Sequence, residues 1–125
     1  MSETLHCTVR DVHGTVAVAE VAGDMDMDTA PRLRSAALAL LEEGRHHLVL
    51  DLSGVEFCDS SGLNVIIGVW RCTRQAAGSL SLVAVPDRLH RLLDITGMAP
   101  LLPTYATEEE ALRAAGQARQ GQDTG

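Results

Sequence analysis

The sequence predicts a single α/β domain with a mixed, mostly parallel β-sheet that opens with an antiparallel hairpin. Two short segments rich in β-branched residues flank a turn, and apolar runs of strand length then alternate with amphipathic segments. The chain has 125 residues, of which 46% are hydrophobic, so it suits one core and is too short for two. The expected order is ββαβαβαβα, with about four α-helices.

The opening hairpin is expected at residues 5–12 and 15–22, with its turn at His13 and Gly14. Both segments are rich in valine, and a glycine-containing turn between two such segments is typical of antiparallel strands.

The first helix is expected over residues 29–43. Asp28 and Thr29 are good N-cap residues, and Pro31 is tolerated in a first helical turn. Apolar residues then recur at helical spacing until Gly44, which provides a stop.

The rest of the chain continues the alternation of strands and helices. In the second helix, the stripe of Leu63, Ile66, Ile67 and Trp70 is expected to be buried against the sheet. We place the domain at residues 1–118 and a polar, flexible tail at 119–125. The remaining elements are a strand at 47–53, a loop through Cys58, a helix at 60–76, a strand at 80–85, a helix from Asp87 to Gly97, a short strand at 102–106 and a helix at 108–118.

Charge and composition exclude several classes of protein. Ten Lys and Arg residues against 17 Asp and Glu give a net charge of -7, which disfavours direct binding to nucleic acid. We see no charged-then-apolar leader and no apolar run near the roughly 18 residues of a membrane span. The three cysteines have no C-x-x-C spacing, so we expect neither disulfides nor a zinc site, and a reducing cytoplasm fits best.

The informative segment is Asp51 to Trp70, which ends a strand with a loop and offers the hydroxyls of Ser60 and Ser61 at a helix start. An exposed serine in that place can be a substrate for modification. Spacing alone favours the simpler interpretation, in which both serines only cap the helix.

Four motifs together resemble one known family. Residues 15–115 are similar to a STAS domain, named for sulfate transporters and anti-sigma-factor antagonists. The matching motifs stand in the order and at the spacing of that family: G-D-M-D-M-D-T-A at 23–30, L-V-L-D-L-S at 48–53, F-C-D-S-S-G-L at 57–63 and R-L-L-D-I-T-G-M at 91–98.

The resemblance implies that Ser60, directly after the Asp of D-S-S-G, is a phosphoacceptor. The implied partner is an anti-sigma factor with serine-kinase activity, a serine phosphatase would reset the switch, and a homodimer is left open. The alternative is a STAS scaffold subunit of a sensory or lipid-transport assembly, in which the serine is only a cap. The implied partner surface consists of Asp26, Asp59, Ser61, Gly62 and Asn64.

Two residues beside the acceptor depart from the family pattern. Asn64 stands where many members have Gly, and Cys58 stands where an aliphatic residue or Met is usual. Both departures bear on which partner is bound. Cys58 lies beside Asp59, so we expect an inert thiol rather than a redox sensor.

No catalytic, metal or cofactor motif accompanies the serine. Asp24, Asp26 and Asp28 alternate as in a calcium loop, but Thr29 and Ser35 replace its Gly and its bidentate Glu. We expect Asp28 to cap the first helix and Asp26 to face the partner. The sequence also lacks a nucleophile elbow and a glycine-rich phosphate loop, so we expect a binding protein without cofactor, not an enzyme.

Overall fold

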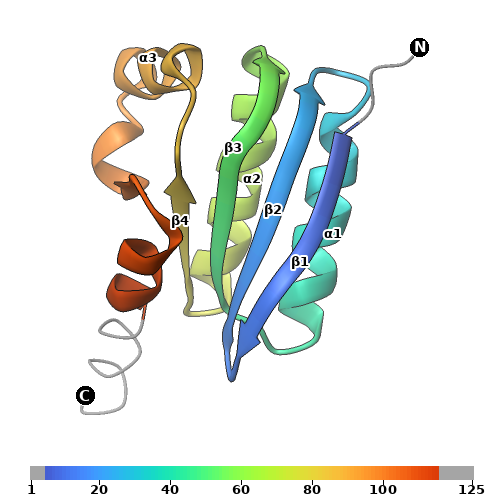
Figure 1. The fold of residues 1–125 in the computed structure, drawn as a ribbon, viewed down its shortest axis with the longest axis vertical. Helices are drawn as coiled ribbons and strands as arrows, with labels where there is room; N and C mark the ends of the chain where they lie inside the picture. The colour runs from blue at the N-terminus through green and yellow to red at the C-terminus, as the bar shows by residue number, and fades with distance from the viewer. Residues whose placement is uncertain (1–4, 116–125) are drawn as a thin grey trace.

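The computed structural model describes residues 5–115, which form one five-stranded sheet with helices on both faces (Figure 1). No helix in this range is long and apolar enough to cross a bilayer. The last helix begins at residue 108, and residues 108–115 of it are described. The other elements are β1 (Leu5–His13), β2 (Val16–Met25), α1 (Ala30–Glu42), β3 (His47–Cys58), α2 (Ser60–Gln75), β4 (Ser79–Val83), α3 (Asp87–Thr96), the 3-10 turn η1 (Ala99–Leu101) and β5 (Thr104–Tyr105).

The sheet has the order β1-β2-β3-β4-β5, so neighbours in sequence are also neighbours in space. β1 and β2 pair antiparallel, and every later pair is parallel. The predicted fold class and element order are therefore confirmed. The carboxyl ends of β2 and β3 lie at the upper end of the sheet in Figure 1, where the β2–α1 loop and the start of α2 meet.

Two apolar layers hold the helices against the sheet. Side chains alternate between the faces along each strand, so Leu48, Leu50 and Leu52 of β3 enter the larger core with α1, α2 and α3. Val49, on the opposite face, packs in a smaller cluster with Ala111 of the last helix.

β3 is longer than predicted. The expected loop through Cys58 is wrong, because this stretch continues to pair with β2 as far as the register Met25↔Cys58. Two register shifts between the strands accommodate the extra residues of β3. The extension depends on a partner strand, and local propensity at Ser53 and Gly54 does not reveal it.

Smaller differences occur at the turns and near the end of the chain. The hairpin turn is Gly14 and Thr15, one residue later than predicted, and Gly14 adopts the positive φ of 60° that favours glycine. The last strand, expected over 102–106, is only β5, because Thr104 and Tyr105 alone pair with β4. Residues 116–118 of the last predicted helix and the predicted tail at 119–125 lie outside the described residues.

The buried face of α2 is rotated slightly from the predicted stripe. Leu63 and Ile66 are fully buried as expected, but Val69 replaces Trp70 and Ile67 on the innermost line. Trp70 is only partly buried, and the Arg74 guanidinium lies 5.3 Å from the centre of its ring.

Gly62 allows the first turn of α2 to approach the end of β2. A Cβ atom at this position would lie 2.8 Å from Cys58 Sγ and 3.1 Å from Met25 Cβ. Both contacts are shorter than unstrained packing permits, so the residue after the two serines must lack a side chain. Gly68, in the same helix, has only Arg34 Nη1 near its virtual Cβ, at 3.9 Å.

The two glycines therefore predict opposite effects on stability. Gly62→Ala should lower the free energy of unfolding by roughly 1–3 kcal/mol, because α2 or Met25 must shift to make room. Gly68→Ala should raise it by up to about 1 kcal/mol, because alanine favours a helix interior and fits without a clash. Urea unfolding of both variants and the parent measures the difference, and a stabilising Gly62→Ala would contradict this packing.

Candidate functional site

The β2–β3 register brings together the two loops that carry the predicted site. Met25 pairs with Cys58 as the last residues of their strands, and the Asp59 amide donates a hydrogen bond to the Met25 carbonyl at 3.2 Å. Asp26 and Asp59 directly follow this pair. The backbones that bear the two acidic residues therefore leave the sheet side by side.

Asp59 is the N-cap of α2. Its Oδ1 accepts a hydrogen bond from the Ser61 amide at 2.8 Å, and its backbone carbonyl accepts from Gly62 N at 3.1 Å and Leu63 N at 3.4 Å. These bonds satisfy first-turn amides that have no partner within the helix. The interpretation in which Ser60 and Ser61 cap the helix is therefore wrong.

Ser60 is the first residue of α2 and is exposed. Its hydroxyl has no hydrogen-bond partner among residues 5–115, because the capping bonds go to its neighbour Asp59. Asn64 is also exposed and lies four residues further, one helical turn along the same face. Ser61 is half-buried and Gly62 is buried, so Gly62 shapes the site from beneath and contributes no surface of its own.

Asp26 organises the β2–α1 loop. Its Oδ1 accepts hydrogen bonds from Asp28 N at 2.9 Å and Thr29 N at 3.0 Å. These hydrogen bonds hold the pKa of Asp26 below its ordinary value, and the bond from the Thr29 amide has the largest effect. The Thr29 hydroxyl in turn donates to the Asp24 carbonyl at 2.5 Å.

This loop corrects the roles expected of its aspartates. We expected Asp28 to cap α1, but the N-cap position is Thr29, and the loop amides bond to Asp26. Asp28 is exposed instead. Sequence spacing does not show which of Asp26 and Asp28 bonds to the loop amides, because both residues precede the helix start by distances that suit an Asx turn.

Two large exposed apolar side chains at this end of the sheet were missed by the sequence analysis. Met27 is 75% exposed in the β2–α1 loop, and Phe57 is 47% exposed near the end of β3. Phe57 is paired in register with Asp24, so it belongs to the same end of the sheet. The alternating D-M-D-M-D run could have predicted that Met27 is exposed, because an apolar side chain between two carboxylates in a loop does not reach the core.

Cys58 is a buried structural residue beneath the site. Burial, together with the nearby charge of Asp59, raises the pKa of its thiol to about 11. The positive charge of Arg88 has a smaller, opposite effect. The thiol is therefore protonated near neutral pH and does not present the thiolate that redox chemistry needs.

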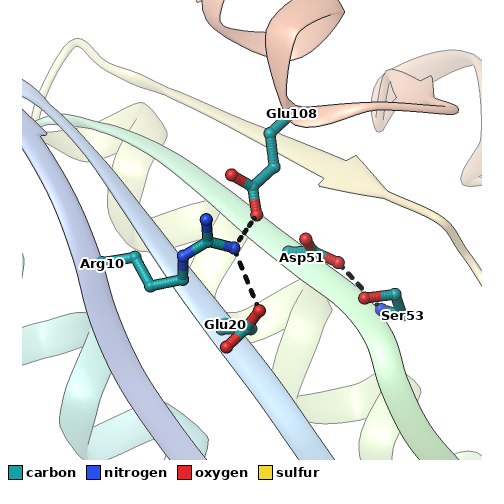
Figure 2. A network of polar contacts seen from close by, with 5 residues as sticks. All are labelled: Arg10, Glu20, Asp51, Ser53 and Glu108. Atoms are coloured by element: carbon teal, nitrogen blue, oxygen red, sulfur yellow. Dashed lines mark hydrogen bonds and ion pairs between the residues drawn. The ribbon is translucent and has the colours of Figure 1, made fainter.

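A second polar cluster lies on the face of the sheet opposite α1 and α2 (Figure 2). One carboxylate oxygen each of Glu20, Asp51 and Glu108 lies within 4.8 Å of the others, a spacing that a metal ion could use. Arg10 already supplies a cation there, because its Nη1 lies 3.0 Å from Glu20 Oε2 and 2.8 Å from Glu108 Oε2. Sequence analysis missed this cluster because its members come from four separate elements.

Comparison with known proteins agrees with this architecture. An anti-sigma F factor antagonist of Paenibacillus polymyxa is 33% identical over 101 residues, which cover 80% of this chain and 86% of that protein. An anti-sigma-B factor antagonist of Bacillus subtilis is 37% identical over 89 residues, covering 71% of this chain and 81% of that one.

A solved structure extends the likeness to three dimensions. The crystal structure of an anti-sigma factor antagonist from Mycobacterium paratuberculosis has a TM-score of 0.78 and 34% sequence identity, and the match covers 89% of this chain and 93% of that one. The family model of the STAS domain matches residues 8–111. The chain therefore belongs to the STAS domain family.

Proposed function

We propose that this protein is an anti-sigma-factor antagonist whose binding to an anti-sigma factor is switched off by phosphorylation of Ser60. The observation that carries the proposal is the exposed Ser60 hydroxyl, which starts a helix that Asp59 caps. The names of the relatives support the same class of function. The protein acts as a binding partner, and the anti-sigma factor supplies the serine-kinase activity.

The division of labour between Asp59 and Ser60 suits a phosphoacceptor. A kinase needs a hydroxyl that can enter its active site without the loss of a hydrogen bond that holds the fold. The hydroxyl of Ser60 makes no such bond within the described residues. Ser61, by contrast, is half-buried. The rigid helix start also presents the Ser60 side chain in one place, which favours a specific encounter.

A phosphate at Ser60 would change the charge of the surface without rebuilding the helix. It adds about -1.5 to -2 charges beside Asp59. The amides of Ser61, Gly62 and Leu63 already donate to Asp59, so they do not draw the phosphate back onto the helix. The new charge therefore faces the partner.

An interface that accepts a neutral hydroxyl disfavours this charge strongly. Binding would have to remove water from a phosphate next to a carboxylate, and an unpaired buried charge costs several kcal/mol. A cost of about 1.4 kcal/mol already weakens binding tenfold. Phosphorylation is therefore expected to release the partner, and a cytoplasmic serine phosphatase would restore binding.

The surroundings of Ser60 indicate the chemistry of the partner surface. Met27 and Phe57 offer exposed apolar side chains, while Asp26 and Asp59 add negative charge. Apolar side chains at the centre of an interface provide most of its affinity, and the charged rim steers the encounter. The complementary surface of the anti-sigma factor should therefore combine an apolar patch with basic residues.

Two substitutions at Ser60 test the switch. Ser60→Ala should bind the co-purifying anti-sigma factor as the parent does, resist phosphorylation, and change stability by less than about 0.5 kcal/mol because Asp59 is the cap. Ser60→Asp should bind at least tenfold more weakly, because one negative charge now faces the partner. Calorimetric titration, with mass-spectrometric mapping of the phosphate, measures both properties.

Gln75→Glu is the matched charge control for Ser60→Asp, since it adds one negative charge at the exposed far end of the same helix. Its affinity should stay at the parent value. Equal affinities for Ser60→Ala and Ser60→Asp would support the scaffold alternative and reject the switch, as would phosphate mapped to Ser61.

The apolar side chains provide a second test. Phe57→Ala and Met27→Ala should each weaken binding of the anti-sigma factor by roughly tenfold or more, because truncating an interface anchor typically costs over 1 kcal/mol. Folding stability should change little for Met27→Ala, whose side chain is 75% exposed, and should fall by about 1 kcal/mol for Phe57→Ala, whose side chain is half-buried. Val9→Ala, at a side chain that is 46% exposed on the edge strand β1, is the control and should leave affinity unchanged. Unchanged affinity for both test variants would place the interface elsewhere.

A further inference from the structure

The last helix is attached to the sheet by a compact polar junction that the proposed function does not use (Figure 2). Glu108, the first residue of this helix, points toward Asp51 of β3, while Arg10 of β1 joins Glu108 to Glu20 of β2. Asp51 is 7% exposed and also accepts a hydrogen bond from the Ser53 amide at 2.9 Å. One helix thus meets three strands through charged side chains.

The apolar contact beneath this junction is small. Ala111 is the fully buried residue of the last helix in the smaller cluster, with Leu112 partly buried beside it. The sheet contributes three valines, and alanine buries little apolar area by comparison with leucine or phenylalanine. The polar junction is therefore a substantial part of what holds the helix in place. The valines are Val18, Val49 and Val83.

The charges of the junction do not balance when every group is ionised. The groups that face Glu108 are Asp51, Glu20 and Arg10, so three carboxylates share one guanidinium. The carboxylate oxygens of Asp51 and Glu108 lie within 4.8 Å of each other, and two carboxylates at this distance repel each other unless one of them carries a proton. The docked helix therefore favours binding of one proton by the pair, because the single guanidinium of Arg10 cannot neutralise three carboxylates.

We propose that the Asp51–Glu108 pair, with Arg10, is a proton-operated latch that docks the last helix when the pair holds a proton and loosens it when the proton is lost. The device is separate from Ser60, which lies beyond the carboxyl end of β3 at the start of α2. It gives the domain a pH-sensitive element on the face opposite α1 and α2.

The pKa values give the direction of the response. Interaction with the neighbouring Asp51 carboxyl, then burial, raises the pKa of Glu108 from 4.5 to about 7. Burial of Asp51 opposes its ionisation, but interactions with Glu108 and Ser53 outweigh this effect and lower the pKa of Asp51. Because docked Glu108 binds its proton more tightly than released Glu108, docking is favoured at low pH and weakens as pH rises from about 4.5 to about 7. Asp51 acts oppositely, and its contribution is lost as pH falls below its ordinary value of 3.8.

Hydrogen exchange and carboxyl titration test the latch in the full chain. Amide protection of residues 109–115, corrected for the intrinsic effect of pH on exchange, should fall at least tenfold between pH 5.5 and 8.5, as each unit of pKa shift changes the docking equilibrium tenfold. Protection of Val49 and Leu50 in β3 should not change. The carbon-13 shift of the Glu108 carboxyl should titrate well above 4.5.

Matched substitutions separate the latch from a general effect of pH. Glu108→Gln keeps a hydrogen-bond donor for Asp51 without the charge, so the last helix should stay protected at both pH values. Glu109→Gln, next to it and 82% exposed, should keep the parent's pH dependence. Titration of Glu108 near 4.5, or protection of residues 109–115 that does not depend on pH in the parent, would overturn the proposal. Both measurements use the unmodified chain and hold even if a variant fails to fold.

Discussion

The pairing of β2 with β3 as far as Met25 and Cys58 is the constraint on which the candidate site depends. It places the β2–α1 loop beside the first turn of α2, and the bond from the Asp59 amide to the Met25 carbonyl fixes this approach. Gly62 then has to lack a side chain, because Met25 and Cys58 occupy the space beneath it. The position of the Ser60 hydroxyl is therefore set by the sheet and is not left to a flexible loop.

Neighbouring residues at the helix start have distinct physical roles. Asp59 bonds to the free amides of the first turn, and the Ser60 hydroxyl has no hydrogen-bond partner among the described residues. In the adjacent loop, Asp26 satisfies the amides of Asp28 and Thr29 in the same way. Because both carboxylates are fixed by backbone amides, they present negative charge at constant positions at the end of the sheet where α2 begins. A group added there changes the surface charge and leaves the cap intact.

The sequence predicted the features that depend on local patterns. Alternating apolar runs gave the order of strands and helices, and the D-S-S-G motif identified the helix start that carries Ser60. Residues 54–58 were missed as strand because their pairing depends on β2, which is distant in sequence. The role of Asp26 depends on how the loop folds after β2 ends. The junction of Arg10 with Glu108 joins residues 98 positions apart, and no periodicity in the sequence relates them.

One end of the sheet and one of its faces carry different chemistry. The end at Ser60 presents a hydroxyl, carboxylates and exposed apolar side chains, while the face opposite α1 and α2 attaches the last helix through ionisable groups.

The most direct measurement of the proposed switch is calorimetric titration of the anti-sigma factor. It compares protein that carries phosphoserine at position 60, introduced during synthesis, with unmodified protein. The account predicts binding at least tenfold weaker for the phosphorylated form with its melting temperature little changed. Equal affinity of the two forms would contradict it.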